Sequence, residues 1–190
     1  MKVIFYRTLL NRASNLTPNE KILYSFLVSK SVSSIEQIFD VDGKTLNQDV
    51  LDDYFSEFGN WFVMCKLNHS KISRELCVTR KTIIGGLNKL EELGYIKYDY
   101  SGDWEIYISR ELLRNGYFEL CNNDFLKGEL LIFYSYLVNK SEKYGYCIDT
   151  FKSKIADDFG KTKVSITKLL NRLYKRGFAE RLDNGKLLIK

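Results

Sequence analysis

The chain has 190 residues, of which 45% are hydrophobic and 28% are charged, and its formal net charge is +5 at pH 7. This length suffices for one medium domain or two small ones, and the apolar and aromatic content excludes a disordered or low-complexity protein. Because no stretch approaches about eighteen uncharged apolar residues and residues 1–15 carry scattered basic side chains, we expect a cytoplasmic protein with neither a membrane span nor a secretory signal.

The first predicted element is a helix over residues 17–32, where apolar residues recur at helical spacing. Residues 33–60 follow and carry seven acidic residues against one lysine. Phe55 and Phe58 interleave with the acidic residues at helical spacing, which predicts an amphipathic acidic helix. We favour this interpretation over a metal-dependent nuclease site, for which the candidate carboxylates are Asp49, Asp52, Asp53 and Glu57.

The rest of the first half predicts an extended run, a short helix, a longer helix and a β-hairpin, at residues 61–67, 70–77, 79–94 and 95–108. Thr79 suits the N-cap of the longer helix, and Gly94 suits its C-terminal end. Residues 101–103 supply the turn of the hairpin.

Residues 109–121 form a connector that we expect to pack rather than flex, because it contains Leu112, Leu113, Tyr117 and Phe118. The same order of elements then recurs at residues 126–141, 146–148, 153–160, 162–177 and 178–189. Thr162 and Gly177 repeat the N-cap and the terminal glycine, and Asn184-Gly185 between apolar runs is the strongest short hairpin signal.

This order recurs because the sequence itself repeats. Residues 24–31 (YSFLVSKS) align with residues 134–141 (YSYLVNKS) at an offset of 110, with six of eight positions identical. A second block aligns at an offset of 83, where LNKL at 87–90 matches LNRL at 170–173. Two matches in the same order favour duplication. The offsets differ by 27 residues, so the acidic segment 33–60 is an insertion in the first copy.

Helix, strand, helix, turn, helix and hairpin is the element order of a winged helix. Residues 77–83 (CVTRKTI), followed by Leu87, Leu90 and residues 91–96 (EELGYI), resemble the helix-turn-helix core of bacterial winged-helix DNA-binding proteins, and residues 159–166 (FGKTKVSI) resemble it a second time. The resemblance implies a mainly α-helical fold with small β-hairpins. It consists of two winged-helix domains in tandem, at residues 1–108 and 122–190, joined by the connector 109–121.

Two winged helices in one small chain more loosely resemble the replication initiators of plasmids and other mobile elements. Residues 16–27 (LTPNEKILYSFL) are similar to the first-helix pattern L-x-x-x-x-K-x-L-Y-x-x-L of such initiators. The resemblance implies binding of double-stranded DNA without catalysis, to start replication or to regulate transcription. A rigid connector would let one chain read two neighbouring major-groove segments.

Charge supports an anionic partner. Residues 71–97 carry six basic and three acidic residues, and residues 152–190 carry eleven basic and four acidic ones.

At about 100° per residue, the helical spacing predicts that Ile83 and Ile166 face the core and that Lys81, Glu92 and Val164 point outward. Asn pairs with adenine, and Lys or Arg contact guanine or phosphates. The predicted DNA-contacting residues are Arg80, Lys81, Thr82, Gly85, Asn88, Lys89, Lys161, Lys163, Ser165, Lys168, Asn171, Arg172 and Lys175. On the hairpins, they are Lys97, Tyr100, Arg181 and Lys186.

Three alternatives remain open from the residues alone. Gly85 and Gly86 allow close approach either to DNA or between helices. The hairpin aromatics Tyr98, Tyr100 and Trp104 are expected to pack on their own domain rather than to stack on single strands. The outward lysines suit either DNA or an ordinary solvated face, so a protein-interaction module without DNA binding is the competing function.

Enzyme chemistry has few residues to work with. The four cysteines form no C-x-x-C pair and His69 is the only histidine, so zinc sites and imidazole-based catalytic pairs lack their residues. The phosphate-binding patterns GxxxxGK[ST] and GxGxxG do not occur. We expect no catalysis, cofactor, metal or small-molecule ligand, and reduced cysteines that behave as partly buried hydrophobic residues. The acidic insertion is expected to contact another protein or a second copy.

Overall fold

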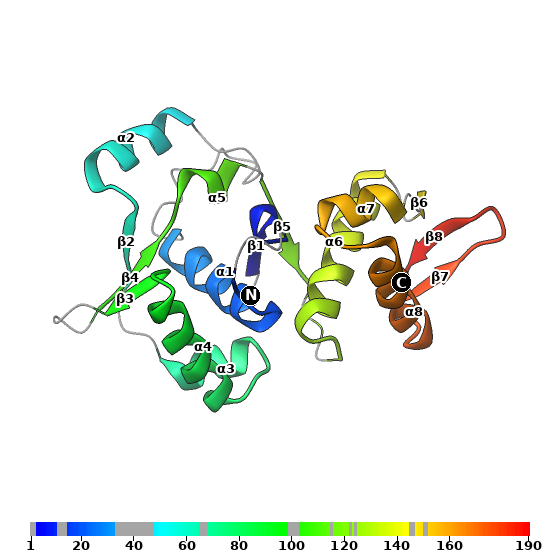
Figure 1. Ribbon diagram of the computed structural model, residues 1–190, viewed down its shortest axis with the longest axis horizontal. Helices are drawn as coiled ribbons and strands as arrows, with labels where there is room; N and C mark the ends of the chain where they lie inside the picture. The colour runs from blue at the N-terminus through cyan, green and yellow to red at the C-terminus, as the bar shows by residue number, and fades with distance from the viewer. Residues whose placement is uncertain are drawn as a thin grey trace.

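The structure is a computed structural model that describes residues 3–10, 15–32, 48–64, 68–98, 103–114, 116–121, 123, 125–144, 147–149 and 152–190. In this part of the chain it is a mixed α/β protein with eight α-helices and small antiparallel sheets (Figure 1). We expected a mainly α-helical chain with two-stranded hairpins. The extended runs expected at residues 61–67 and 146–148 join the two hairpins as third strands, and one further pair of strands adds to the predicted β content.

The first half follows the predicted order of elements: α1 (Pro18–Val32), α2 (Gln48–Phe58), β2 (Trp61–Met64), α3 (His69–Glu75), α4 (Arg80–Glu92), β3 (Ile96–Tyr98) and β4 (Trp104–Tyr107). Strand β4 lies between β2 and β3 in an antiparallel sheet, where Ile106 is opposite both Phe62 and Ile96. The predicted helices and strands are confirmed with small shifts of their bounds. Residues 65–67 and most of the predicted turn at 101–103 lie outside the described residues.

The second half repeats this order in α6 (Gly128–Tyr144), β6 (Cys147–Asp149), α7 (Lys152–Asp158), α8 (Lys163–Lys175), β7 (Ala179–Arg181) and β8 (Lys186–Ile189). Its sheet has the order β6-β8-β7, which matches β2-β4-β3 strand for strand. The repeat in the sequence therefore corresponds to a repeat in topology.

A pair of tyrosines shows that the repeat extends to individual side chains. The hydroxyl of Tyr24 on α1 donates to the carbonyl oxygen of Tyr107 at the end of β4. At the matching positions, the hydroxyl of Tyr134 on α6 donates to the carbonyl oxygen of Lys190, which follows β8, at 2.5 Å. Each half thus ties its first helix to its last strand by the same hydrogen bond.

The two halves meet along a pair of strands that the sequence did not predict. Strand β1 (Val3–Tyr6), followed by the 3-10 helix η1 (Arg7–Leu10), pairs antiparallel with β5 (Tyr117–Leu120), which follows α5 (Arg110–Arg114). Phe5 faces Phe118 with ring centroids 5.3 Å apart, and both side chains are fully buried. Helices α1 and α6 also contact each other, so a continuous hydrophobic core runs through both halves.

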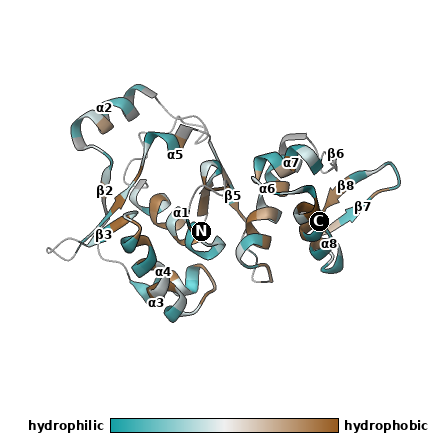
Figure 2. Cartoon of the chain, viewed as in Figure 1, coloured by the Kyte–Doolittle hydropathy of each residue, from teal (hydrophilic) through white to brown (hydrophobic). Residues whose placement is uncertain are grey.

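The two hairpins lie far from each other in the fold, and the acidic helix α2 lies away from α3 and α4. In Figure 1, β1 and β5 lie in the middle, the hairpins β3–β4 and β7–β8 extend toward opposite ends, and α2 lies on the other side of the first half from α3 and α4. Figure 2 shows hydrophobic colour on β5 and hydrophilic colour on β7 and along much of α4. Hydrophilic residues are therefore prominent on α4 in the first half and on β7 in the second.

Candidate nucleic-acid interface

Helices α4 and α8 begin with the same cap, as predicted. The backbone N–H of Thr82 donates to the hydroxyl oxygen of Thr79 at 3.2 Å, and the N–H of Ser165 donates to that of Thr162 at 3.2 Å. The two hydroxyls of each pair also lie 2.9 Å and 3.0 Å apart. Side-chain capping of this kind satisfies an N–H that has no partner within the helix. The two helices therefore start in the same register.

Both helices also end alike and bury the predicted stripe. Gly94 and Gly177, with φ of +74° and +76°, take up the left-handed conformation that glycine accepts most readily. The core-facing residues are all buried, as predicted: Ile83, Leu87, Leu90, Ile166, Leu170 and Leu173. The buried stripe and the caps of α4 and α8 together determine which side chains of these helices face outward.

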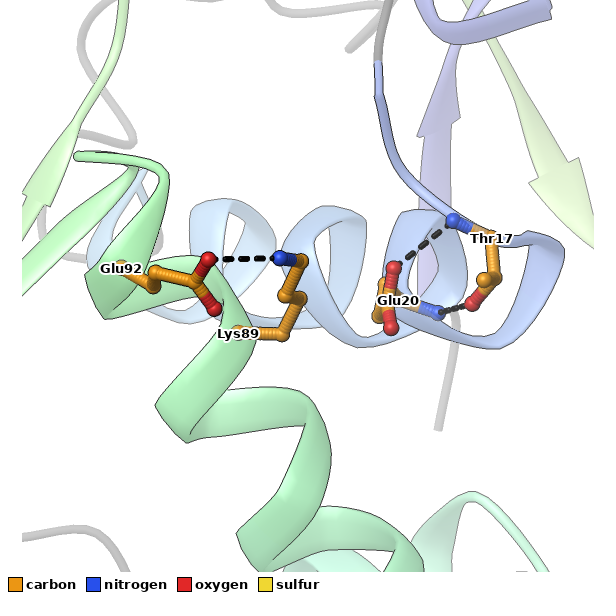
Figure 3. A network of polar contacts seen from close by, with 4 residues as sticks. All are labelled: Thr17, Glu20, Lys89 and Glu92. Carbon is orange, nitrogen blue, oxygen red and sulfur yellow. Dashed lines mark hydrogen bonds and ion pairs between the residues drawn. The ribbon is translucent and has the colours of Figure 1, made fainter.

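The outward face of α4 carries few unpaired charges. Arg80, Lys81 and Asn88 are exposed, as expected for groups that contact DNA. Lys89 is half-buried, and its Nζ lies 2.8 Å from Glu92 Oε1 (Figure 3). Because Glu92 neutralises it, Lys89 has less charge to offer a phosphate than Lys81 has.

The adjacent glycines Gly85 and Gly86 have different surroundings. A Cβ built on Gly86 would lie 2.7 Å from Leu23 Cδ2 on α1, whereas one built on Gly85 has no described atom within 4 Å. Gly86 therefore allows α4 to pack closely on α1, and exposed Gly85 leaves the outward face of α4 open. Close approach between helices therefore applies to Gly86, and close approach to DNA stays a prediction for Gly85.

The outward face of α8 is more basic. Its exposed polar side chains are Lys163, Lys168, Asn171, Arg172 and Lys175. None of the four basic ones forms an ion pair with another described residue. Val164, predicted to point outward but not included among the DNA-contacting residues, is 65% exposed in the first turn. Its helical position indicated this exposure.

Lys161 lies apart from the outward face of α8. Its Nζ is 2.6 Å from Glu129 Oε1 on α6, and its side chain is largely buried. Burial lowers the pKa of Lys21 on α1, the charge of Lys161 lowers it further, and Glu129 opposes both. These three residues therefore form a cluster at the junction of the two halves, where Lys161 is directed to Glu129.

The hairpins present a different set of groups. Lys97 forms an ion pair with Glu105 and lies 4.4 Å from the ring centroid of Trp61. Tyr98 packs edge-on against Trp104 at 5.1 Å while remaining 54% exposed, which favours packing on its own domain. In the second hairpin, Arg181 and Lys186 are exposed, whereas Tyr100 of the first lies outside the described residues.

The acidic helix predicted within the insertion is confirmed as α2. It packs on the first half through Phe55, whose ring lies 5.9 Å from that of Phe62, and through Asp52, which pairs with Arg110 at 2.8 Å. The described residues contain no group of three or more His, Cys, Asp or Glu that could hold a metal ion. Within the same residues, no helix is long and apolar enough to cross a membrane.

One cysteine differs from expectation. Cys77 is exposed, because it occupies the turn between α3 and α4 with a φ of +52°. The apolar neighbours of Cys77 in the sequence did not indicate this exposure. Cys121 is half-buried, and the side chains of Cys65 and Cys147 are not described.

Comparison with models of protein families, with curated proteins and with solved structures finds no match to this chain.

Proposed function

We propose that the chain is a double-stranded DNA-binding protein made of two winged helices in tandem, with α4 and α8 as recognition helices. The observation that carries this proposal is the outward face of α8. Four basic side chains and Asn171 lie there exposed, and the basic ones have no ion-pair partner in the described structure. Duplex DNA is the partner that such a face suits best, because its phosphates release counterions when lysine and arginine replace them.

The topology supports a winged-helix arrangement in both halves. Each half has a first helix, a strand, two helices joined by a turn, and a hairpin whose second strand is central in a three-stranded sheet. In a helix-turn-helix, the second helix enters the major groove and the first crosses the backbone. Helices α3 and α7 would then contact the backbone, and α4 and α8 the bases.

Each group on the two helices has a distinct part in this proposal. Asn88 and Asn171 can pair with adenine through two hydrogen bonds, and the lysines and arginines contact guanine or phosphates. Arg181 and Lys186 on the second hairpin reach phosphates beside the site. The acidic helix α2 lies on the far side of the first half from α4 (Figure 1), where it does not repel the phosphates and is free to contact a protein.

The biological use we propose is to start replication of a mobile element or to regulate transcription in the cytoplasm. The similarity of residues 16–27 to the first helix of plasmid initiators supports replication. The DNA next to the coding region separates the two uses, because iterated repeats indicate replication and a promoter indicates transcriptional control.

The first test is fluorescence anisotropy of the full chain with random-sequence duplex DNA over a salt series. We expect binding at low salt, and a slope of log affinity against log salt of about −4 or steeper, since several phosphates are neutralised together. Absence of binding at low salt would overturn the proposal and favour the competing function, in which the same helices bind a protein.

Substitutions on α4 and α8 test whether these two helices are responsible for DNA binding. Replacing Lys81, Asn88, Lys168 and Arg172 together by alanine should abolish binding, because the proposal places these side chains against the DNA. All four are exposed and none belongs to the core, so the variant should keep the native fold. Lys140→Gln is the control, since Lys140 lies on α6 and is 3.9 Å from Asp158. This control should bind as the native chain does.

A further inference from the structure

The two recognition helices can be compared position by position. Thr79 and Thr162 cap them identically, and both helices are 13 residues long. The second residue of each helix is therefore Lys81 in α4 and Val164 in α8, and the ninth is Asn88 in α4 and Asn171 in α8. The asparagines agree, whereas the residues in the first turn differ in chemistry.

Val164 is an apolar side chain with no core to pack on. It is 65% exposed, while its helix buries four other apolar side chains on the opposite face. The first turn of a recognition helix is the part that contacts base edges. A side chain at this place thus has its methyl groups directed to the groove rather than to the protein.

The neighbouring hydroxyls are already engaged within the helix. Ser165 Oγ lies 3.0 Å from Thr162 Oγ1 in the cap, and Thr167 Oγ1 donates to the carbonyl oxygen of Lys163 at 2.9 Å. At the start of α8, the groups left to contact bases are therefore the charge of Lys163 and the methyls of Val164. The major groove offers a single apolar group, the C5-methyl of thymine.

We infer that Val164 contacts the C5-methyl of a thymine, an inference that rests on the proposed function. The DNA site then has two unequal halves. Both halves contain adenine opposite the asparagine, at Asn88 and Asn171. The half read by α8 has thymine opposite Val164, and the half read by α4 has guanine opposite Lys81, because an ammonium group binds the acceptors of guanine.

The experiment begins with selection of a preferred site by the full chain from a random duplex pool. Each thymine of that site is then replaced, one at a time, by deoxyuridine, which lacks only the methyl group. One replacement should weaken binding about fourfold, the factor that corresponds to burial of one methyl group. Val164→Ala should weaken binding to the thymine site by a similar factor and have no further effect on the deoxyuridine site.

A specificity swap gives the control. Val164→Lys places in α8 the residue that α4 carries, so selection should change thymine to guanine at that base pair and leave the other half unchanged. Because Val164 is exposed, these variants should keep the native circular dichroism spectrum and melting temperature. Native binding that no deoxyuridine weakens, or an unchanged selected base with Val164→Lys, would overturn the inference. Failure of the native chain to bind any duplex would overturn the proposed function itself.

Discussion

The two halves of the molecule share their internal frame and differ on their outer faces. Helix α4 contains three basic and two acidic residues, whereas α8 contains four basic residues and no acidic one over the same length. Their caps and buried stripes coincide. The positions that close the helix and fill the core are alike in the two halves, whereas the outward faces differ in charge.

The halves also differ in one buried polar contact. On α6, the hydroxyl of Tyr136 donates to Asp158 at the end of α7. The matching positions in the first half hold Phe26 and Glu75. Glu75 Oε2 is buried and has no hydrogen-bond partner in the described structure. Glu75 therefore lacks a described partner of the kind that Asp158 has in the second half.

The largest expected effect tests the contrast between the two outer faces. Replacing Lys168, Arg172 and Lys175 by glutamine should lower DNA affinity about 100-fold at physiological salt and make the log–log salt slope less negative by about 3. The matched triple change of Arg80, Lys81 and Lys89 should change the slope by only about 2, because Lys89 is already paired with Glu92. Anisotropy titrations over a salt series measure both, and equal slopes would contradict the contrast.

The second prediction concerns the spacing between α1 and α4. Leu169 in α8 matches Gly86 in α4, so Gly86→Leu gives the first half the residue that the second half has at this position. A Cβ on Gly86 already meets Leu23, so this variant should lower the free energy of unfolding by about 2 kcal/mol after the gain in helix propensity. Gly85→Ala, with open space around it, should raise it by about 0.5–1 kcal/mol. Urea denaturation followed by circular dichroism measures both, and two changes of the same sign would refute the assignment.

The third prediction tests the unequal buried contact. Tyr136→Phe removes the hydroxyl that donates to Asp158 and should lower the free energy of unfolding by about 1.5 kcal/mol. Phe26→Tyr introduces the hydroxyl in the first half and should raise this free energy by about 1 kcal/mol by donating to Glu75. Thermal melts of the two variants and the native chain give the comparison. A destabilised Phe26→Tyr variant would show that the first half cannot accommodate the group.

The smallest effect is confined to alkaline solution. Burial raises the pKa of Tyr24, and nearby Tyr95 raises it further, while burial raises the pKa of the less enclosed Tyr134. The unfolded chain releases these protons near pH 10 and the folded chain retains them, so stability is unaffected below pH 10 and falls as the pH rises above it. Tyr24→Phe should reduce this fall more than Tyr134→Phe does. Urea melts at pH 8 and above pH 10 measure the difference, and an equal reduction would contradict it.

Much of each half follows from local patterns in the sequence. The caps at Thr79 and Thr162, the terminal glycines and the apolar stripes of α4 and α8 involve residues within a few positions of one another. Backbone geometry and helical spacing are therefore enough to predict them from the sequence. The repeat also showed in advance that both halves would share one order of elements.

Only the tertiary structure decided how these elements meet. Strands β1 and β5 are short and more than a hundred residues apart, so no local signal marks their pairing. The close approach of Gly86 to Leu23 joins α4 to α1, and the pairing of Lys161 with Glu129 joins the turn before α8 to α6. The sequence alone established which faces are buried and which are basic. Close packing between distant segments selected the partner of each face, because a pattern along one helix has no information about the side chains that will lie against it.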